Sequence, residues 1–345
     1  MNKQKLPYLD WGPILSYQRY ITMLIGGRGI GKSYGCKKVI IKDFLKNGNQ
    51  FIWLRRYKEE KKIAKDGFFT DVKEAFPGHV FTTKGNDAYI DGKLAGVFFA
   101  LSQVGSSKGS VKLQKPRTLV FDEYIVEVET CGANGYFYKE GNMLLNFTET
   151  FSRTRNDFRL FILANNTSIT NPLYDMFNIS FKVGEIGKRV LPEIYVEQLE
   201  TPEELKKMKD QTNLGKVMKK YAKDLYDYNV NNKALYGSDS KIAKVPIGAH
   251  QYMNIIDKNM VIYIYMKRDE MSRNKVFYAG LKGQKDFRLR YTFDLEQASD
   301  DVIFVDKTNL SLPIRDLANV YKRGRLFFEN QQVKSLLDER LKKYL

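Results

Sequence analysis

A glycine-rich segment near the start of the chain has the strongest chemical signal in the sequence. Residues 26–33 read GGRGIGKS, which matches the phosphate-loop pattern G-x-x-x-x-G-K-[S/T] without interruption. In such a loop the backbone N–H groups converge on phosphate oxygens, the lysine contacts the β and γ phosphates, and the hydroxyl group takes one position on Mg²⁺. The sequence therefore predicts that ATP and Mg²⁺ bind to the whole loop, which consists of Gly26, Gly27, Arg28, Gly29, Ile30, Gly31, Lys32 and Ser33.

The residues on either side of the loop suit this interpretation. Residues 21–25 are an apolar run that predicts a buried strand, and the residues after Lys32 can begin a helix whose N-terminal amides face the phosphates. Arg28 has two open interpretations, because it either touches phosphate or is a solvated loop residue.

Two adjacent carboxylates supply the groups that ATP hydrolysis needs. Residues 117–123 read RTLVFDE, an apolar strand that ends in Asp122 and Glu123. Hydrolysis requires a bound metal ion and a water molecule aimed in line with the γ-phosphate. Asp122 is predicted to hold Mg²⁺ through water, together with Ser33, and Glu123 to orient and polarise the attacking water. A carboxylate directly after the metal-binding aspartate favours hydrolysis over phosphoryl transfer to a substrate.

A polar segment follows the next predicted strand. Residues 158–164 read FRLFILA and predict a strand, and Asn165, Asn166 and Thr167 come directly after them. A side-chain amide at this point can contact the γ-phosphate or the water and report hydrolysis to the rest of the protein. Asn165 is preferred over Asn166 for this role. The alternative is that both are turn residues, since Asn and Thr favour local hydrogen bonds in loops.

Two arginines precede that strand, in residues 151–156 with the sequence FSRTRN. Arg153 and Arg155 therefore lie toward the edge of the sheet opposite the ligand end, from which an arginine reaches a neighbouring subunit's nucleotide more easily than its own. Such an inserted arginine stabilises charge in the transition state and contributes roughly 10³ to 10⁵ in rate. Both residues also fit the simpler description of surface arginines.

Basic residues gather in two segments that are candidates for DNA contact. The first follows a predicted strand at residues 51–54, and the second is a Gly- and Ser-rich segment at residues 102–115. Lys and Arg side chains in such segments bind the phosphate backbone without reading bases. A solvated helix face and an ordinary solvated loop are the alternatives. The predicted DNA contacts are Arg56, Lys58, Lys61, Lys108 and Lys112.

The composition restricts the classes of protein. The chain has 345 residues, 43% of them hydrophobic, with a net charge of +17 and a pI near 9.5, which favours a polyanionic partner such as nucleic acid. No apolar stretch approaches the roughly 20 residues of a membrane-spanning helix, and residues 1–7 have no signal-peptide character, so we expect a cytoplasmic protein without a membrane partner. The chain has only two cysteines and two histidines, which argues against a disulfide framework, a zinc site and histidine-based catalysis.

The order of elements predicts an α/β protein with two domains. Strands alternate with helical segments in the first part of the chain, which is typical of a mostly parallel sheet with its ligand at the carboxyl ends of the strands. Residues 201–204 read TPEE, a capping box that predicts a Lys-rich helix running to about residue 228. New strands and a basic C-terminal helix follow. The predicted divisions are an ATPase domain at 1–200, a helical linker at 201–235 and a second α/β domain at 236–345.

The order of the motifs GGRGIGKS, TLVFDE, FSRTRN and LANNTSITNP resembles the DNA-packaging ATPases of phi29-like phages over essentially the full chain. The resemblance implies a P-loop ATPase of the additional-strand, catalytic-glutamate (ASCE) class. It also implies a homomeric ring, a pentamer, that drives double-stranded DNA into a procapsid at its portal vertex in the host cytoplasm. Arg153 or Arg155 falls where this family places its trans-acting finger, and Asn165 falls at the sensor position.

The same resemblance implies that the C-terminal domain is similar to an inactive RNase H-like nuclease. This sequence agrees in one respect, because the predicted strand at residues 260–265 has no carboxylate for a two-metal nuclease site. By resemblance, that domain contacts the capsid vertex and, in some relatives, a structural packaging RNA.

Three other functions fit parts of the pattern. A helicase on single strands would use aromatic stacking beside a basic groove, and the 22 Tyr and 22 Phe residues leave that open. A nucleotide-switched binding protein would work by ordering a loop, and Glu123 argues against it. A small-molecule or nucleotide kinase would not explain the net charge of +17 or the second domain.

Overall fold

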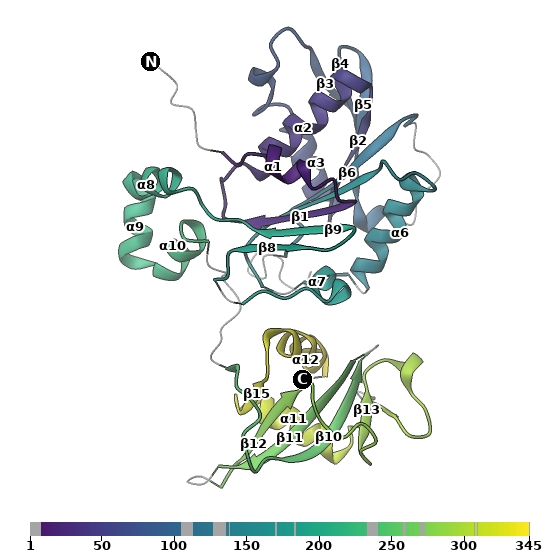
Figure 1. Cartoon of the computed structure of the whole chain (residues 1–345), viewed down its shortest axis with the longest axis vertical. Helices are drawn as coiled ribbons and strands as arrows, with labels where there is room; N and C mark the ends of the chain where they lie inside the picture. The colour runs from purple at the N-terminus through teal and green to yellow at the C-terminus, as the bar shows by residue number, and fades with distance from the viewer. Residues whose placement is uncertain are drawn as a thin grey trace. The chain divides into compact units, whose positions relative to one another are not determined.

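The chain forms two compact units in a computed structural model, Met1–Tyr236 and Gly237–Leu345 (Figure 1). The structure describes residues 8–104, 113–126, 136–137, 139–169, 171–182, 184–232, 241–257, 260–269, 273–306, 308 and 310–344. Among these residues, no helix combines the length and the hydrophobicity needed to cross a bilayer.

The first unit is built on a nine-stranded, mostly parallel sheet with the order β3-β4-β5-β2-β6-β7-β1-β9-β8. The six strands from β5 to β9 in this order run parallel, while β3, β4 and β8 join the two edges as antiparallel strands. Strand β7 lies between β1 and β6, which is the additional strand that the resemblance implies. The strands are β1 (Ile21–Gly26), β2 (Gln50–Arg55), β3 (Phe81–Lys84), β4 (Asp87–Ile90), β5 (Lys93–Ala100), β6 (Pro116–Asp122), β7 (Arg159–Asn165), β8 (Gly187–Val190) and β9 (Ile194–Gln198).

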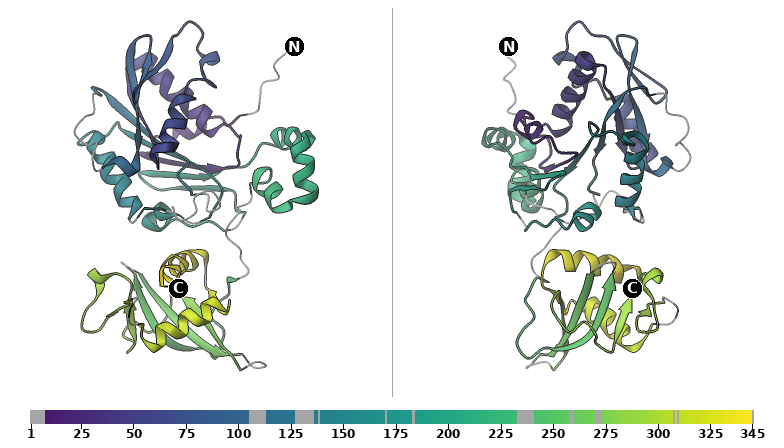
Figure 2. Two further views of the ribbon diagram at one scale, coloured as in Figure 1. Left: turned by 180° about the vertical axis from the view of Figure 1, so that it is seen from behind. Right: turned by 45° about the vertical axis from the view of Figure 1, so that its right-hand side comes forward.

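Helices cover both faces of this sheet (Figure 2). All six residues of β1 and of β2 are buried, because successive side chains of each strand enter two different cores. Met23 packs in the core with α6 (Glu140–Ser152) and α7 (Pro172–Phe177), whereas Leu24 packs in the core with α1 (Gly12–Ser16) and α2 (Lys32–Asn47). The predicted α/β fold with a mostly parallel sheet is confirmed. Helix α3 (Lys58–Asp66) follows β2.

The Lys-rich segment after the sheet consists of three short helices, so the prediction of one long helix is wrong. They are α8 (Glu203–Gln211), α9 (Asn213–Tyr221) and α10 (Lys223–Asn229). Thr212 breaks the helix because its backbone is extended and its side chain caps α9 by accepting from the Gly215 N–H at 2.9 Å. The predicted capping box does not form either, since α8 begins at Glu203 with Pro202 at the cap position.

The second unit contains a six-stranded mixed sheet with the order β14-β13-β10-β11-β12-β15. Two helices, α11 (Leu312–Lys322) and α12 (Gln331–Tyr344), pack with the sheet in one core. This unit is the second α/β domain that the sequence predicts. Its strands are β10 (His250–Asp257), β11 (Met260–Arg268), β12 (Lys275–Gly280), β13 (Arg290–Thr292), β14 (Ile303–Phe304) and β15 (Leu326–Phe328).

Candidate functional site

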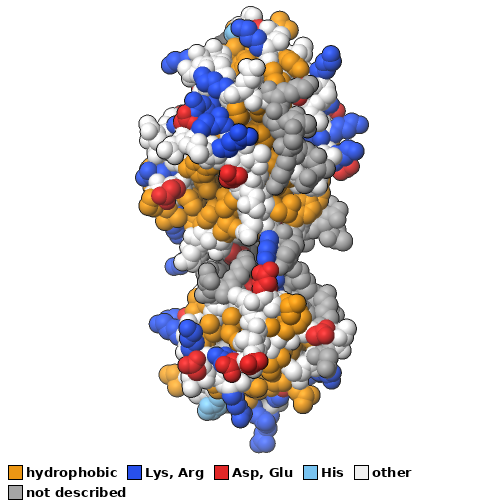
Figure 3. Space-filling model, turned by 90° about the vertical axis from the view of Figure 1, so that its right-hand side faces the viewer, with side chains coloured by type: hydrophobic (Ala, Val, Ile, Leu, Met, Phe, Trp, Pro, Cys, Tyr) orange, Lys and Arg blue, Asp and Glu red, His pale blue; other side chains and the backbone are white. Residues whose placement is uncertain are grey.

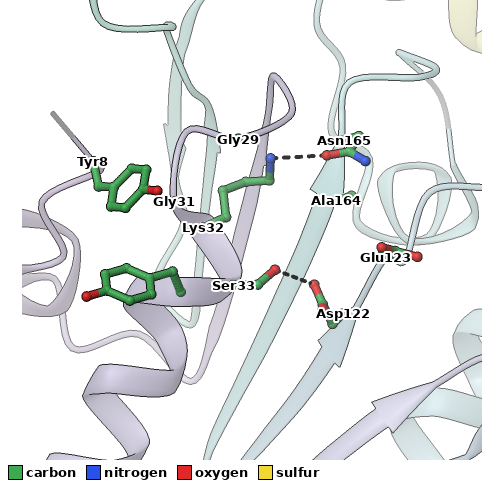
Figure 4. Close-up of a pocket in the computed structure, with 10 residues that line it drawn as sticks. Tyr8, Gly29, Gly31, Lys32, Ser33, Asp122, Glu123, Ala164 and Asn165 are labelled. Carbon is green, nitrogen blue, oxygen red and sulfur yellow. Dashed lines mark hydrogen bonds between the residues drawn. The ribbon is translucent and has the colours of Figure 1, made fainter. Parts of the chain in front are cut away.

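The glycine-rich segment forms a tight loop between β1, which ends at Gly26, and α2, which begins at Lys32 (Figure 4). Gly29 has φ +76° and Gly31 has φ +90°, a left-handed conformation that only glycine adopts easily. Gly31 occupies the N-cap position of α2. The loop therefore directs backbone amides and the N-terminus of a 16-residue helix at the same point, which is an anion-binding arrangement.

The side chain of Lys32 is folded back over this loop. Its Nζ donates to the carbonyl oxygens of Gly26 at 2.9 Å and Gly27 at 2.8 Å, and to Oδ1 of Asn165 at 3.3 Å. Lys32 is only 7% exposed, and burial lowers its pKa to about 7, against a smaller opposing effect of Asp122. A buried ammonium group without a full counter-charge is suited to binding phosphate.

Ser33 and Asp122 form the next pair of polar contacts. The Ser33 hydroxyl donates to Oδ1 of Asp122 at 2.8 Å, joining the first turn of α2 to the end of β6. Hydroxyl and carboxylate oxygens are the donors that Mg²⁺ prefers, so these two side chains fit a magnesium ion. Among the described residues, no group of three or more His, Cys, Asp and Glu side chains forms a metal site. This donor set suits an ion that is shared with substrate phosphates.

Arg55 is a site residue that is not selected from the sequence. Its guanidinium group pairs with Oδ2 of Asp122 at 3.3 Å and with Oε2 of Glu123. The strand register explains the contact, because Leu54 of β2 is opposite Phe121 of β6, which brings the next residues of both strands together. The signal that could have found it is the position of Arg55 at the end of a strand beside the acidic strand.

Glu123 follows β6 in a strained backbone conformation, with φ +57°. The side chain is 59% exposed and lines the same cavity as Lys32 and Ser33, so its carboxylate is accessible to a water molecule in that cavity.

Asn165 and Asn166 have different positions. Asn165 is opposite Gly26 in the β1–β7 register and accepts a hydrogen bond from Lys32. Asn166 is 3% exposed and donates from Nδ2 to the carbonyl oxygen of Asn232 at 2.7 Å. Asn165 thus lies in the site, and Asn166 connects the end of β7 to the segment after α10.

A cavity of about 240 Å³ is lined by Lys32, Ser33, Asp122, Glu123 and Asn165, and a larger cavity of about 710 Å³ shares part of its lining. Tyr8 and Tyr34 line both cavities, and their ring centroids are 5.2 Å apart. The larger cavity is also lined by Trp11, Leu15 and Val39. The site therefore combines a compartment at the loop with a larger one beside α2, whose lining also includes the charged residues Asp10, Lys38 and Lys42.

Residues 3–345 match the family described as Podovirus DNA encapsidation protein (Gp16). The chain belongs to this family. It is 32% identical over 333 residues to the DNA packaging protein of Bacillus phage B103, a match that covers 96% of this chain and 99% of that protein. It is 30% identical over 334 residues to the DNA packaging protein of Bacillus phage phi29, with 96% of each chain covered. The predicted resemblance to phi29-like packaging proteins is confirmed.

Solved structures of phi29 proteins match the fold of this encapsidation protein. A chain of the bacteriophage phi29 viral genome packaging motor assembly has a TM-score of 0.76 at 26% identity, covering 98% of this chain and 100% of that one. The N-terminal domain of the DNA packaging ATPase of phi29 has a TM-score of 0.52 at 37% identity, covering 57% of this chain and 98% of that one.

The two candidate finger arginines of this encapsidation protein lie away from its own loop. Arg153 ends α6 with φ +45° and is exposed, and the guanidinium group of Arg155 donates to the carbonyl oxygens of Phe151 and Ser152. Both precede β7, whose other end is Asn165, and a strand of that length spans about 20 Å. Neither arginine joins the cavity described above.

Arg56 requires a correction. It is 2% exposed, its guanidinium group pairs with the Glu140 carboxylate at 2.7 Å, and it contacts the carbonyl oxygen of Tyr124 and the ring of Phe121. The prediction that Arg56 contacts DNA is wrong, because its charge is already neutralised in the interior.

The other predicted DNA contacts differ in exposure. Lys61 is 9% exposed and donates to Oε1 of Gln103 at 3.1 Å, whereas Lys58 is exposed. Lys108 and Lys112 lie outside the described residues. On the face drawn in Figure 3, Lys and Arg side chains are spread among acidic ones in both units, so charge on this face does not single out a DNA-binding surface.

Proposed function

We propose that this encapsidation protein hydrolyses ATP at the site around Lys32 and uses the energy to move double-stranded DNA into a procapsid. The observation that carries the proposal is the meeting of the glycine-rich loop with Ser33, Asp122 and Glu123 in one cavity. The matched phi29 domain comes from a DNA packaging ATPase, which supports the same activity here.

Each side chain of the site has a role that follows from its contacts. Lys32 exchanges its backbone carbonyl partners for phosphate oxygens, which supply the counter-charge that it lacks. Ser33 and Asp122 would hold Mg²⁺, and the ion would neutralise phosphate charge when bound. Glu123 orients the attacking water and accepts its proton. Asn165 lies beside Lys32 and contacts the same phosphate end of the nucleotide.

Arg55 controls where the Glu123 carboxylate points. The ion pair between them holds the carboxylate beside β2, so Glu123 must leave or share this partner to serve a water molecule. The larger cavity is the place for the base and ribose, since the glycine-rich loop takes the phosphates and Tyr8 and Tyr34 line both cavities.

The assembly that this function needs is a ring, which we infer to be a pentamer at the portal vertex in the host cytoplasm. Arg153 or Arg155 would enter the nucleotide site of a neighbouring subunit, which fits their distance from their own. Lys58, Lys108 and Lys112 would contact the DNA backbone. Residues 1–200 would act as the ATPase domain and 201–235 as a helical linker. Residues 236–345 would act as an inactive nuclease-like domain that contacts the vertex and a structural RNA.

Glu123→Gln tests the catalytic assignment directly. The amide cannot accept the proton, so we expect steady-state ATP hydrolysis to fall by roughly 10² to 10⁴ while Mg·ATP still binds. Glu59→Gln, a change at an exposed carboxylate of α3, is the matched control and should keep full activity. Normal hydrolysis in Glu123→Gln would refute the assignment.

A further inference from the structure

Lys209 belongs to α8, far in sequence from the glycine-rich loop, yet its ammonium group contacts that loop. Its Nζ donates to the carbonyl oxygen of Arg28 and to the carbonyl oxygen of Asn229, at 2.6 Å in both cases. Arg28 is part of the loop, and Asn229 is the last residue of α10. One side chain therefore joins the loop to two of the three helices after the sheet.

The contact with Arg28 has a consequence for the neighbouring amide. In a trans peptide the C=O and N–H groups point in opposite directions. Because Lys209 holds the Arg28 carbonyl, the N–H of Gly29 is turned to the other side of the peptide plane. Gly29 lines the cavity that contains Lys32 and Glu123, and converging backbone amides are what such a loop offers to phosphate.

The helices around Lys209 are closely packed and joined by hydrogen bonds. A Cβ atom on Gly215 would lie 2.0 Å from the Lys209 carbonyl oxygen, so α8 and α9 are in close contact at this corner. The Asp210 carboxylate accepts from Lys219 of α9 at 3.1 Å and from the Tyr226 hydroxyl of α10. These contacts join the three helices to one another, and the Lys209 side chain connects them to the loop.

A second contact connects the same helices to the end of β7. The hydroxyl groups of Thr167 and Tyr228 are 3.2 Å apart, and the Arg28 guanidinium group lies 5.9 Å from the centre of the Tyr228 ring. Thr167 comes two residues after Asn165. The glycine-rich loop and the segment after β7 therefore both contact α10, one through Arg28 and the other through Thr167.

We propose that Lys209 is a positioning residue of the nucleotide site, which orients the Arg28–Gly29 peptide and couples nucleotide binding to the packing of helices α8–α10. The inference rests on the proposed ATP site. The charge of Lys209 is also close enough to lower the pKa of Lys32, and burial lowers the pKa of Lys209 itself. Phosphates at the loop would therefore meet positive charge from outside the loop as well as from within it.

Lys209→Met in the full chain removes the ammonium group and keeps the aliphatic stem. Loss of these charge-assisted hydrogen bonds should raise the Kd for Mg·ADP, measured by isothermal titration, about tenfold. Lys207→Met, at an exposed lysine of the same helix, should change the Kd less than twofold. Lys209→Arg, which keeps the charge, should recover part of the lost affinity.

Hydrogen exchange separates coupling from a merely structural role. In the wild-type chain, Mg·ADP should slow amide exchange in α8–α10 as well as in the loop, and Lys209→Met should abolish the change in the helices. If ADP binds the wild-type chain and leaves exchange in these helices unchanged, the inference is wrong without any variant. A Lys209→Met chain that melts earlier but binds ADP normally would also overturn it. Failure of the wild-type chain to bind ADP would instead refute the proposed nucleotide site.

Discussion

Lys32 is the residue whose environment most depends on its ligand. Burial lowers its pKa to about 7. The ammonium group is hydrogen-bonded to the neutral carbonyl groups of Gly26 and Gly27, whereas a bound phosphate would carry negative charge. Bound phosphates favour the ammonium form and raise this pKa back toward the ordinary value.

This shift predicts that nucleotide binding takes up a proton above pH 7. At pH 8.5 the free site holds mostly neutral Lys32 and the phosphate-bound site holds the ammonium form, so affinity should decrease as the pH rises above about 7. Titration of Mg·ADP at pH 8.5 in two buffers with different ionisation enthalpies measures the uptake. As a control, Lys46→Met, which changes an exposed lysine of α2, should take up as many protons on binding Mg·ADP as the wild-type chain. Identical binding enthalpies in both buffers would contradict the prediction.

Several residues of the site can be predicted from the sequence, because the carboxyl ends of neighbouring parallel strands meet at one edge of the sheet. That rule brings Asp122 and Asn165 to the glycine-rich loop, where the structure places them. The same rule does not predict that Arg55 and Arg56 have different partners. Arg55 ends β2 and Arg56 follows it, but the first turns to Asp122 and the second to Glu140, which is 84 residues further along the chain.

The buried pair of Arg56 and Glu140 joins two elements, the end of β2 and the first residue of α6. Its side chains are 3% and 0% exposed, so solvent does not screen the interaction. The carboxylate also accepts from the backbone N–H of Phe137 at 2.9 Å. This pair holds α6 against the strand that ends in Arg55.

Arg56→Met should lower the free energy of unfolding by about 3–5 kcal/mol, because it leaves the Glu140 carboxylate buried without its counter-charge. Urea unfolding of the full chain, followed by far-UV circular dichroism, measures the change. The control is Lys58→Met, which alters an exposed lysine two residues away and should shift stability by at most about 0.5 kcal/mol. Equal stability of the two variants would show that the pair is dispensable.

Strands were more predictable than helices in this chain. The strands β1 and β2 are mostly apolar, which is a strong pattern for a buried parallel sheet. The segment after residue 200 has a helical composition over its whole length, and its breaks depend on particular contacts. Thr212 caps a new helix, and Gly215 permits the close approach to Lys209, neither of which a composition of lysines and leucines indicates.

At the scale of the whole molecule, each unit has its own hydrophobic core. In the second unit, side chains of α11 and α12 pack with four strands, β10, β11, β12 and β15, in a single cluster that also includes Tyr291 of β13. We therefore expect a fragment of residues 237–345 to fold independently. It should show a cooperative thermal transition and dispersed amide resonances in an NMR spectrum. A fragment with non-cooperative melting would show that this core needs the first unit.

Steady-state ATP hydrolysis with and without long double-stranded DNA tests whether hydrolysis is coupled to DNA movement. The assay should include procapsids, a protein concentration that permits ring formation, and two salt concentrations. We predict that DNA stimulates hydrolysis, that added salt weakens the stimulation because the grip relies on phosphate contacts, and that Glu123→Gln abolishes it. If DNA leaves the hydrolysis rate unchanged under these conditions, or if hydrolysis persists in Glu123→Gln, the protein is not a DNA-translocating ATPase that uses Glu123.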